Sequence, residues 1–192
     1  PLYSSAASDV YKRQIVNEHP IQLKYRSFKA RSANSFIFYP YLLKEYRNRW
    51  FVYGVRGNGR ILQNLALDRI QSLEVLPQEH YIKNTFFDPN TFFDDLVGVT
   101  KNSGSVAEKI GFKVAAAEAP YIITKPIHRS QQVVERLADG SVILEIEVVI
   151  NHELERVFFG YAEGIQILYP KTLVELMGRK LKKAAEQYTH SK

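Results

Sequence analysis

The chain has 192 residues, of which 45% are hydrophobic and 12% aromatic, enough for a core in one large domain or two small ones. It has no cysteine, which excludes disulfides and thiolate metal sites. No apolar run reaches the roughly 18 residues of a membrane-spanning helix, and no secretory signal opens the sequence. We therefore expect a cytoplasmic location and no membrane partner.

The positive charge lies in the first half of the chain. Residues 1–90 hold 13 basic and 7 acidic side chains, whereas residues 91–192 hold 13 of each. Nine basic residues fall between positions 24 and 60, against the single acid Glu45. This asymmetry favours an anionic partner for the first half. The alternative is an ordinary solvated basic surface.

Residues 1–14 are small, polar and aperiodic. We expect them to be a non-native or disordered leader outside the fold. The chain begins at Pro1 and its only methionine is Met177, which indicates a fragment or a processed product.

Residues 15–78 are expected to form a small barrel of short strands. The first strand alternates apolar and polar side chains, as a half-buried strand does. Arg47-Asn48 and Gly57-Asn58-Gly59 predict tight turns, because Asn and Gly tolerate positive φ. The expected strands cover residues 20–28, 36–46 and 49–56, followed by residues 61–70 and 71–76 as two more strands or one bent strand.

Residues 79–90 are expected to be a linker, and residues 91–192 a second domain. Strands are expected at residues 106–116, 131–137, 142–150 and 165–168. Helices are expected at residues 91–96, 118–124, 151–161 and 170–187. Apart from the short helix at 91–96, the order β-α-β-β-α-β followed by a terminal helix is that of a ferredoxin-like α+β domain.

The sequence resembles the WYL-domain family, named for a Trp-Tyr-Leu triplet on a barrel strand. The triplet corresponds to Trp50-Phe51-Val52, and the closing strand Leu-Asp-Arg-Ile to residues 67–70. Residues 139–140 (Asp-Gly) and 169–173 (Tyr-Pro-Lys-Thr-Leu) match the extension that often follows the barrel. The chain departs from the family at Gln63 and Ala66, where arginines are common.

The resemblance implies a β + α/β chain: a small Sm/SH3-like β-barrel followed by a ferredoxin-like extension. It implies the effector-sensing region of a bacterial transcription regulator, which is not an enzyme. Such proteins usually bind operator DNA as homodimers through an N-terminal winged helix-turn-helix, which we expect this chain to lack. Their effector resembles a nucleic acid, such as short single-stranded DNA or an oligonucleotide.

Eight residues of the first domain are candidates for the effector site. Guanidinium groups bind phosphate in bidentate geometry, tyrosine rings stack on bases, and hydroxyl or amide groups read base edges or sugars. The candidates are Tyr25, Ser27, Tyr39, Tyr41, Arg47, Arg49, Asn64 and Arg69. The alternatives are that the tyrosines fill the core, that Arg47 and Arg49 form a solvated turn, and that Arg69 pairs with Asp68 or Glu74.

The sequence predicts no catalytic residue, no cofactor and no metal site. It lacks a phosphate-binding Walker loop and a Gly-x-Ser-x-Gly nucleophile motif, and its five histidines are scattered. The alternative function is a direct Sm-like single-stranded nucleic-acid-binding module without an allosteric role. Such a module would bind with an affinity governed by phosphate count and would lose it steeply with salt.

Overall fold

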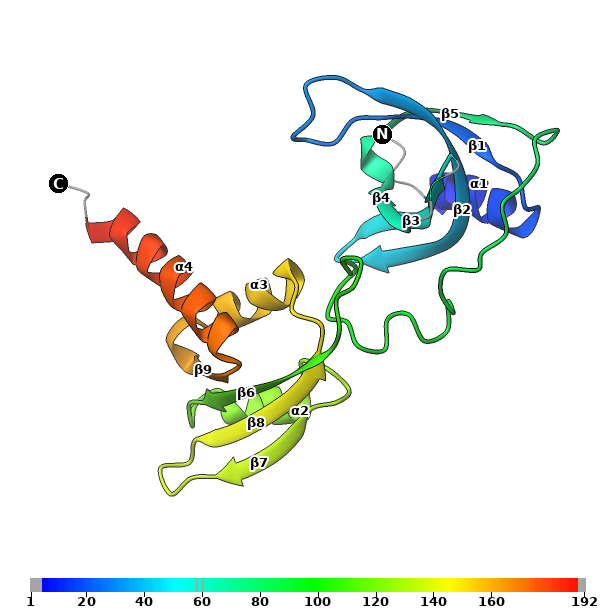
Figure 1. Cartoon of the computed structure of the whole chain (residues 1–192). Helices are drawn as coiled ribbons and strands as arrows, with labels where there is room; N and C mark the ends of the chain where they lie inside the picture. The colour runs from blue at the N-terminus through cyan, green and yellow to red at the C-terminus, as the bar shows by residue number, and fades with distance from the viewer. Residues whose placement is uncertain (1–4, 58, 60, 190–192) are drawn as a thin grey trace. The chain divides into compact units, whose positions relative to one another are not determined.

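The computed structural model describes residues 5–57, 59 and 61–189, which divide into two compact units, Pro1–Phe92 and Phe93–Lys192. Each unit contains one antiparallel sheet together with helices, so the chain has a mixed α and β fold (Figure 1). No helix in this described part is long and apolar enough to cross a membrane.

The first unit is built on a five-stranded antiparallel sheet with the order β4-β3-β2-β1-β5. Its elements are α1 (Ser5–Val16), β1 (Ile21–Tyr25), β2 (Asn34–Tyr46), β3 (Arg49–Arg56), β4 (Gln63–Ala66), the 3-10 helix η1 (Leu67–Arg69) and β5 (Ile70–Val75). The long strand β2 bends along its course (Figure 1). Within the described residues β4 and β5 do not pair with each other, so the sheet does not close into the expected barrel.

The alternating pattern of the first strand sets the register of this sheet. Ile21 and Leu23 are fully buried and lie opposite Phe38 and Phe36 of β2. A one-residue slip would turn these apolar side chains to the other face, so their burial specifies the pairing. The predicted turn between β2 and β3 is confirmed, because Arg47 and Asn48 have φ values of +49° and +59°.

Residues 5–16 form helix α1, where the sequence suggested no element before residue 15. Its Gln14 is buried. Residues 1–4 lie outside the described residues, so whether the leader is native stays a prediction. The helix was missed because its sequence has no clear apolar period.

The segment after β5 contains no helix or strand up to Phe92, and it packs on one face of the sheet. Residues 91–96 form turns in place of the predicted helix. The backbone nitrogens of Thr91 and Phe92 both donate to the carbonyl oxygen of Asp88. The Phe92 ring then packs against Tyr53 and Phe87, with ring centroids 5.7 and 4.7 Å away. These contacts stabilise a tight turn at residues 88–92, where the sequence predicted that a helix begins.

The second unit is a four-stranded antiparallel sheet with the order β7-β8-β6-β9. Its elements are β6 (Glu108–Val114), α2 (Ala119–Thr124), β7 (Gln132–Arg136), β8 (Val142–Val148), α3 (His152–Tyr161), the 3-10 helix η2 (Ala162–Gly164), β9 (Ile165–Tyr169) and α4 (Lys171–Thr189). The order of helices and strands from residue 106 onward is the one predicted.

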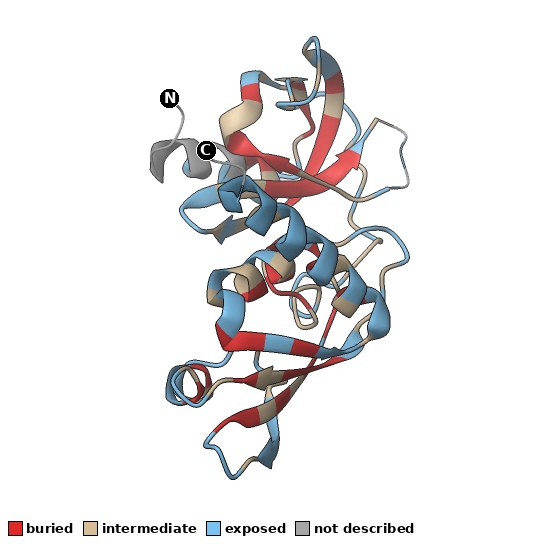
Figure 2. Cartoon of the chain, turned by 90° about the vertical axis from the view of Figure 1, so that its left-hand side faces the viewer, coloured by how far each residue is buried: buried red, intermediate tan, exposed pale blue. Residues whose placement is uncertain are grey.

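One face of this second sheet is apolar. Alternate residues of β6 and β8 are buried, whereas every residue of the edge strand β7 is exposed (Figure 2). Helix α3 begins at an N-cap, Asn151, whose side-chain oxygen accepts from the Leu154 nitrogen at 2.8 Å. Leu154 and Phe158 of α3 and Leu173 and Met177 of α4 complete the core.

Candidate functional site

A pocket of about 320 Å³ opens in the first unit where β1 ends and β5 begins. Its lining residues are Arg26, Ser27, Phe28, Asp68, Arg69, Ile70 and Gln71. The β1–β5 register shifts between Lys24 and Tyr25, and such a bulge redirects the residues that follow it. The backbone nitrogen of Arg26 donates to the Arg69 carbonyl oxygen at 3.1 Å, which holds the two lining segments together.

The wall of the pocket contains an Arg-Asp-Arg arrangement. The Asp68 side chain is only 5% exposed, and its Oδ2 lies 3.0 Å from Nε of Arg49. Its Oδ1 lies 3.9 Å from Nε of Arg69, which is too far for a hydrogen bond. One carboxylate therefore stands between two guanidinium groups, and Arg26 adds a third arginine to the pocket lining.

The rim of the pocket carries an exposed aromatic ring. Phe28 is 76% exposed, and the Arg69 guanidinium carbon lies 4.4 Å from its ring centroid. This distance is within the range of a cation–π contact, which at exposed sites is worth about 0.5–1 kcal/mol. A flat ring beside cationic groups offers a stacking surface next to phosphate-binding donors.

The structure brings three of the eight predicted site residues together. Ser27 and Arg69 line the pocket, and Arg49 reaches its wall through Asp68. Tyr25 lies close by, at the end of β1, where it pairs with Ile70 of β5 and packs against the sheet core.

Two of the predicted tyrosines belong to a different region, which we call the aromatic cluster. Tyr39 and Tyr41 are each 8% exposed and pack with Val55 beneath residues of the segment after β5. The Tyr81 ring meets both edge-on, at centroid distances of 6.0 and 6.1 Å, and Phe86 stacks on Tyr41. In the described structure these rings are core residues, not an open stacking surface.

Burial also determines the protonation of the aromatic cluster. It raises the pKa of Tyr41 to about 12, with a smaller contribution from Tyr39. The pKa of Tyr81 is raised further, mainly by burial. The Tyr81 hydroxyl donates to the carbonyl oxygen of Pro40, whereas the Tyr41 hydroxyl is buried with no hydrogen-bond partner among the described residues. Burial therefore disfavours ionisation of the Tyr41 and Tyr81 hydroxyls by raising the pKa of each.

The two remaining predicted residues lie elsewhere in the first unit. Arg47 is exposed at the β2–β3 turn, with its guanidinium carbon 5.5 Å from the Tyr46 ring centroid. Asn64 is partly buried on β4, where it pairs with Tyr53. Neither residue lines the pocket.

Sequence reasoning missed five of the seven lining residues, and three of these carry a charge or an exposed ring. Asp68 precedes Arg69 in the Leu-Asp-Arg-Ile strand, but only the arginine was chosen as a ligand. Arg26 was counted with the basic residues of the first half and given no role. Phe28 follows the alternating strand, and an aromatic residue at that point of a polar loop was the available indication.

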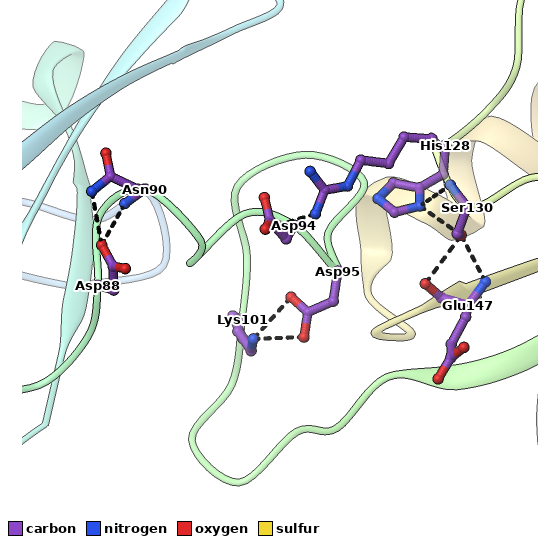
Figure 3. A network of polar contacts seen from close by, with 9 residues as sticks. Asp88, Asn90, Asp94, Asp95, Lys101, His128, Ser130 and Glu147 are labelled. Atoms are coloured by element: carbon purple, nitrogen blue, oxygen red, sulfur yellow. Dashed lines mark hydrogen bonds and ion pairs between the residues drawn. The ribbon is translucent and has the colours of Figure 1, made fainter.

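The second unit contains a polar network that includes a serine and a histidine (Figure 3). His128 Nδ1 lies 2.8 Å from Ser130 Oγ and also accepts from the Ser130 backbone nitrogen at 3.2 Å. The Ser130 hydroxyl oxygen accepts from the Glu147 nitrogen at 2.9 Å and contacts the Glu147 carbonyl oxygen at 3.3 Å. These bonds fasten a turn to β8.

Ion pairs and protonation complete the network. Arg129 pairs with Asp94 at 2.7 Å, and Lys101 pairs with Asp95 at 2.7 Å (Figure 3). Burial, and then the charge of Arg129, lower the pKa of His128. The contacts of the serine and histidine are accounted for by the turn that they hold, so we assign the network a structural role.

Comparison with known proteins identifies both units. The WYL domain family matches residues 9–75, and the WCX domain family matches residues 107–185. No curated protein matches the chain.

Several solved structures are similar to this chain, among them the following two. A CRISPR Cas-related protein is 13% identical with a TM-score of 0.53 over 94% of this chain and 50% of its own, a likeness of fold alone. Proteasome accessory factor B/C of Arthrobacter aurescens is 16% identical with a TM-score of 0.37, over 96% of this chain and 27% of its own. The chain thus spans half or less of these two solved structures. The chain therefore contains a WYL domain followed by a WCX domain.

Proposed function

We propose that this chain is the effector-sensing region of a bacterial transcription regulator, and that the pocket lined by Arg26 and Arg69 binds a nucleic-acid-like anion. The effector would be short single-stranded DNA or an oligonucleotide. The observation that carries the proposal is the pocket itself, with cationic side chains beside an exposed ring. This combination suits a ligand that has both phosphates and bases.

The charges of the pocket favour an anion over a neutral ligand. Arg49 and Arg69 flank the single carboxylate of Asp68, and Arg26 lines the same pocket. Arginine is suited to phosphate because its planar fork of donors matches two phosphate oxygens. The net positive charge of residues 1–90 would also steer an anionic ligand toward this unit.

We propose the same architecture for the regulator as in the rest of its family. The curved five-stranded sheet would correspond to the Sm/SH3-like barrel in an open, unclosed form, and the second unit to a ferredoxin-like domain. The strand order β7-β8-β6-β9 supports the ferredoxin-like assignment, as do helix α2 between β6 and β7 and helix α3 between β8 and β9. The full-length protein would act in the cytoplasm as a homodimer that binds operator DNA through a winged helix-turn-helix. Its role would be binding, not catalysis.

The test is fluorescence anisotropy with labelled short single-stranded oligonucleotides. Wild type should bind saturably, and Arg69→Ala should weaken binding about 10- to 100-fold, because a hydrogen bond to a charged group contributes about 1.5–3 kcal/mol. Arg136→Ala is the matched control, because Arg136 is exposed on β7 and the same charge is lost. Absence of binding at low salt would overturn the proposal, as would equal losses in the two variants.

The same titration separates a sensor from a direct nucleic-acid-binding module. A module would gain affinity with every added phosphate, with a salt slope of about −0.7 per phosphate contacted. A sensor pocket of this size should reach a limiting affinity and slope at a short oligonucleotide length. A slope that keeps growing with length would support the module instead.

A further inference from the structure

Asp68 is unusual because one of its carboxylate oxygens has no hydrogen-bond partner. Oδ2 is occupied by Arg49, but Oδ1 is buried with no partner among the described residues. The same is true of Nε of Arg69, 3.9 Å away. A buried polar atom left without a partner costs about 1–3 kcal/mol, so such atoms are rare in folded proteins. Here an acceptor and a donor are both unsatisfied in residues that line one pocket.

The two unsatisfied atoms define what a ligand must offer. Both atoms are shielded from solvent and face each other at 3.9 Å, so a ligand that separates this pair must offer an anionic acceptor to Arg69 and a hydrogen-bond donor to Asp68. A simple anion such as inorganic phosphate would satisfy the arginine but would meet the negative charge of Asp68. A nucleotide can satisfy both, because it carries a phosphate and, in three of the four DNA bases, an exocyclic amino group. Acceptance from the cytosine N4 amino group by a carboxylate is an established mode of base recognition.

Thymine and uracil have no amino group, and their one Watson–Crick donor, N3–H, is less accessible to a carboxylate. Their Watson–Crick edge has two carbonyl oxygens on either side of a single N–H group. A carbonyl oxygen placed against Oδ1 of Asp68 would leave two acceptors facing each other. The ring of Phe28, by contrast, stacks on any base and makes little distinction between them. Discrimination in this pocket must therefore come from its polar wall.

We propose that Asp68 selects the base of the nucleotide that binds in this pocket, favouring bases with an amino group over thymine and uracil. The inference rests on the proposed function, because it requires that the pocket bind an oligonucleotide. Asp68 is then a specificity-determining residue, and its ion pair with Arg49 holds the carboxylate in place.

The test compares oligodeoxycytidine with oligodeoxyuridine of the same length by fluorescence anisotropy. The two share phosphate number and ring size and differ at the base edge, so the ratio of their dissociation constants isolates base recognition. Wild type should prefer oligodeoxycytidine by about 10-fold, within the range of discrimination by one good base contact. In Asp68→Asn the ratio should fall to about one, because an amide both donates and accepts.

Two further measurements keep the result interpretable. Asp68→Asn removes a negative charge and will raise the affinity for both ligands, but the ratio does not depend on that shared term. Arg49→Gln retains the Asp68 carboxylate but removes the ion pair that holds it in place, so it should reduce the preference without abolishing it. Circular dichroism checks that each variant is folded.

The outcomes are distinct. Equal binding of the two ligands by wild type would overturn the inference and leave the proposed function intact. A preference that persists in Asp68→Asn would also overturn it, by placing recognition elsewhere. Failure to bind either oligonucleotide would overturn the proposed function itself.

Discussion

The pocket around Asp68 and Arg69 and the aromatic cluster around Tyr39 and Tyr41 belong to the same five-stranded unit, yet their polar atoms are in opposite situations. In the aromatic cluster, aromatic rings fill the space, and burial raises the pKa of Tyr41. In the pocket, Asp68 Oδ1 and Arg69 Nε lack hydrogen-bond partners in the described part of the chain, beside about 320 Å³ of open volume. Residues suited to nucleic-acid binding therefore form a core in one place and a candidate site in the other.

The difference comes from what covers each face. The segment after β5 crosses the β2–β3 region and places Tyr81 and Phe86 on the rings of Tyr39 and Tyr41. Phe28, in the loop between β1 and β2, remains 76% exposed. Chain topology, more than residue type, decides which aromatic residue is available to a ligand.

The largest expected effect tests whether the aromatic cluster is only structural. Tyr41→Ala should lower the free energy of unfolding by about 3–5 kcal/mol, as large-to-small changes of buried aromatic residues do. Oligonucleotide affinity per folded molecule should not change, because Tyr41 does not line the pocket. Urea denaturation measures the first quantity and anisotropy the second. Tyr188→Ala, at an 85% exposed position, is the control and should alter neither. A folded Tyr41→Ala protein with weakened binding would make the aromatic cluster part of the site.

Much of the fold follows from local sequence patterns. Alternation predicted β1 within a few residues, and Arg47-Asn48 marked the turn between β2 and β3. In the second unit the strands and helices follow one another in the predicted order. These features depend on neighbours in sequence, which is why pattern and turn chemistry reveal them. Helix α1 has weak periodicity, and it was missed for that reason.

The candidate site was less accessible to sequence reasoning. Same-parity positions placed Tyr39 and Tyr41 on one face correctly, but the pattern carries no information about a distant segment that covers that face. Likewise, Asp68 acquires its importance from Arg49 on another strand and from the η1 corner that places it beside Arg69. Contacts between remote segments distinguish a core face from a binding face, and a single sequence does not encode them in any local pattern.

An intermediate effect is expected at the rim of the pocket. Phe28→Leu should weaken oligonucleotide binding by about 1–3 kcal/mol, the usual contribution of one base stacked on an aromatic ring. The free energy of unfolding should change by no more than about 0.5 kcal/mol, because the position is exposed. Anisotropy and urea denaturation again give the two values. Phe28→Tyr retains a ring and should bind like wild type. If Phe28→Leu binds oligonucleotides as tightly as wild type, the Phe28 ring does not stack on the ligand. Exposure would then not distinguish Phe28 from the aromatic cluster in function.

The smallest effect concerns the buried hydroxyl of Tyr41. Tyr41→Phe removes a polar atom that has no hydrogen-bond partner among the described residues, so it should raise the free energy of unfolding by about 1 kcal/mol at neutral pH. The difference in the free energy of unfolding between Tyr41→Phe and wild type should increase at alkaline pH. The pKa of Tyr41 is about 12 in the folded protein against an ordinary value of 10.0, so the unfolded chain releases this proton first. The wild-type free energy of unfolding therefore falls as the pH rises from about 10 toward 12, and Tyr41→Phe lacks this contribution.

Urea denaturation at a series of alkaline pH values measures that difference. Tyr188→Phe, which changes an exposed tyrosine in the same way, is the matched control and should follow the wild-type curve. A constant difference between Tyr41→Phe and wild type across this pH range would show that the Tyr41 hydroxyl is solvated. In that case the aromatic cluster is open to water, and Tyr41 is again a candidate ligand-binding residue.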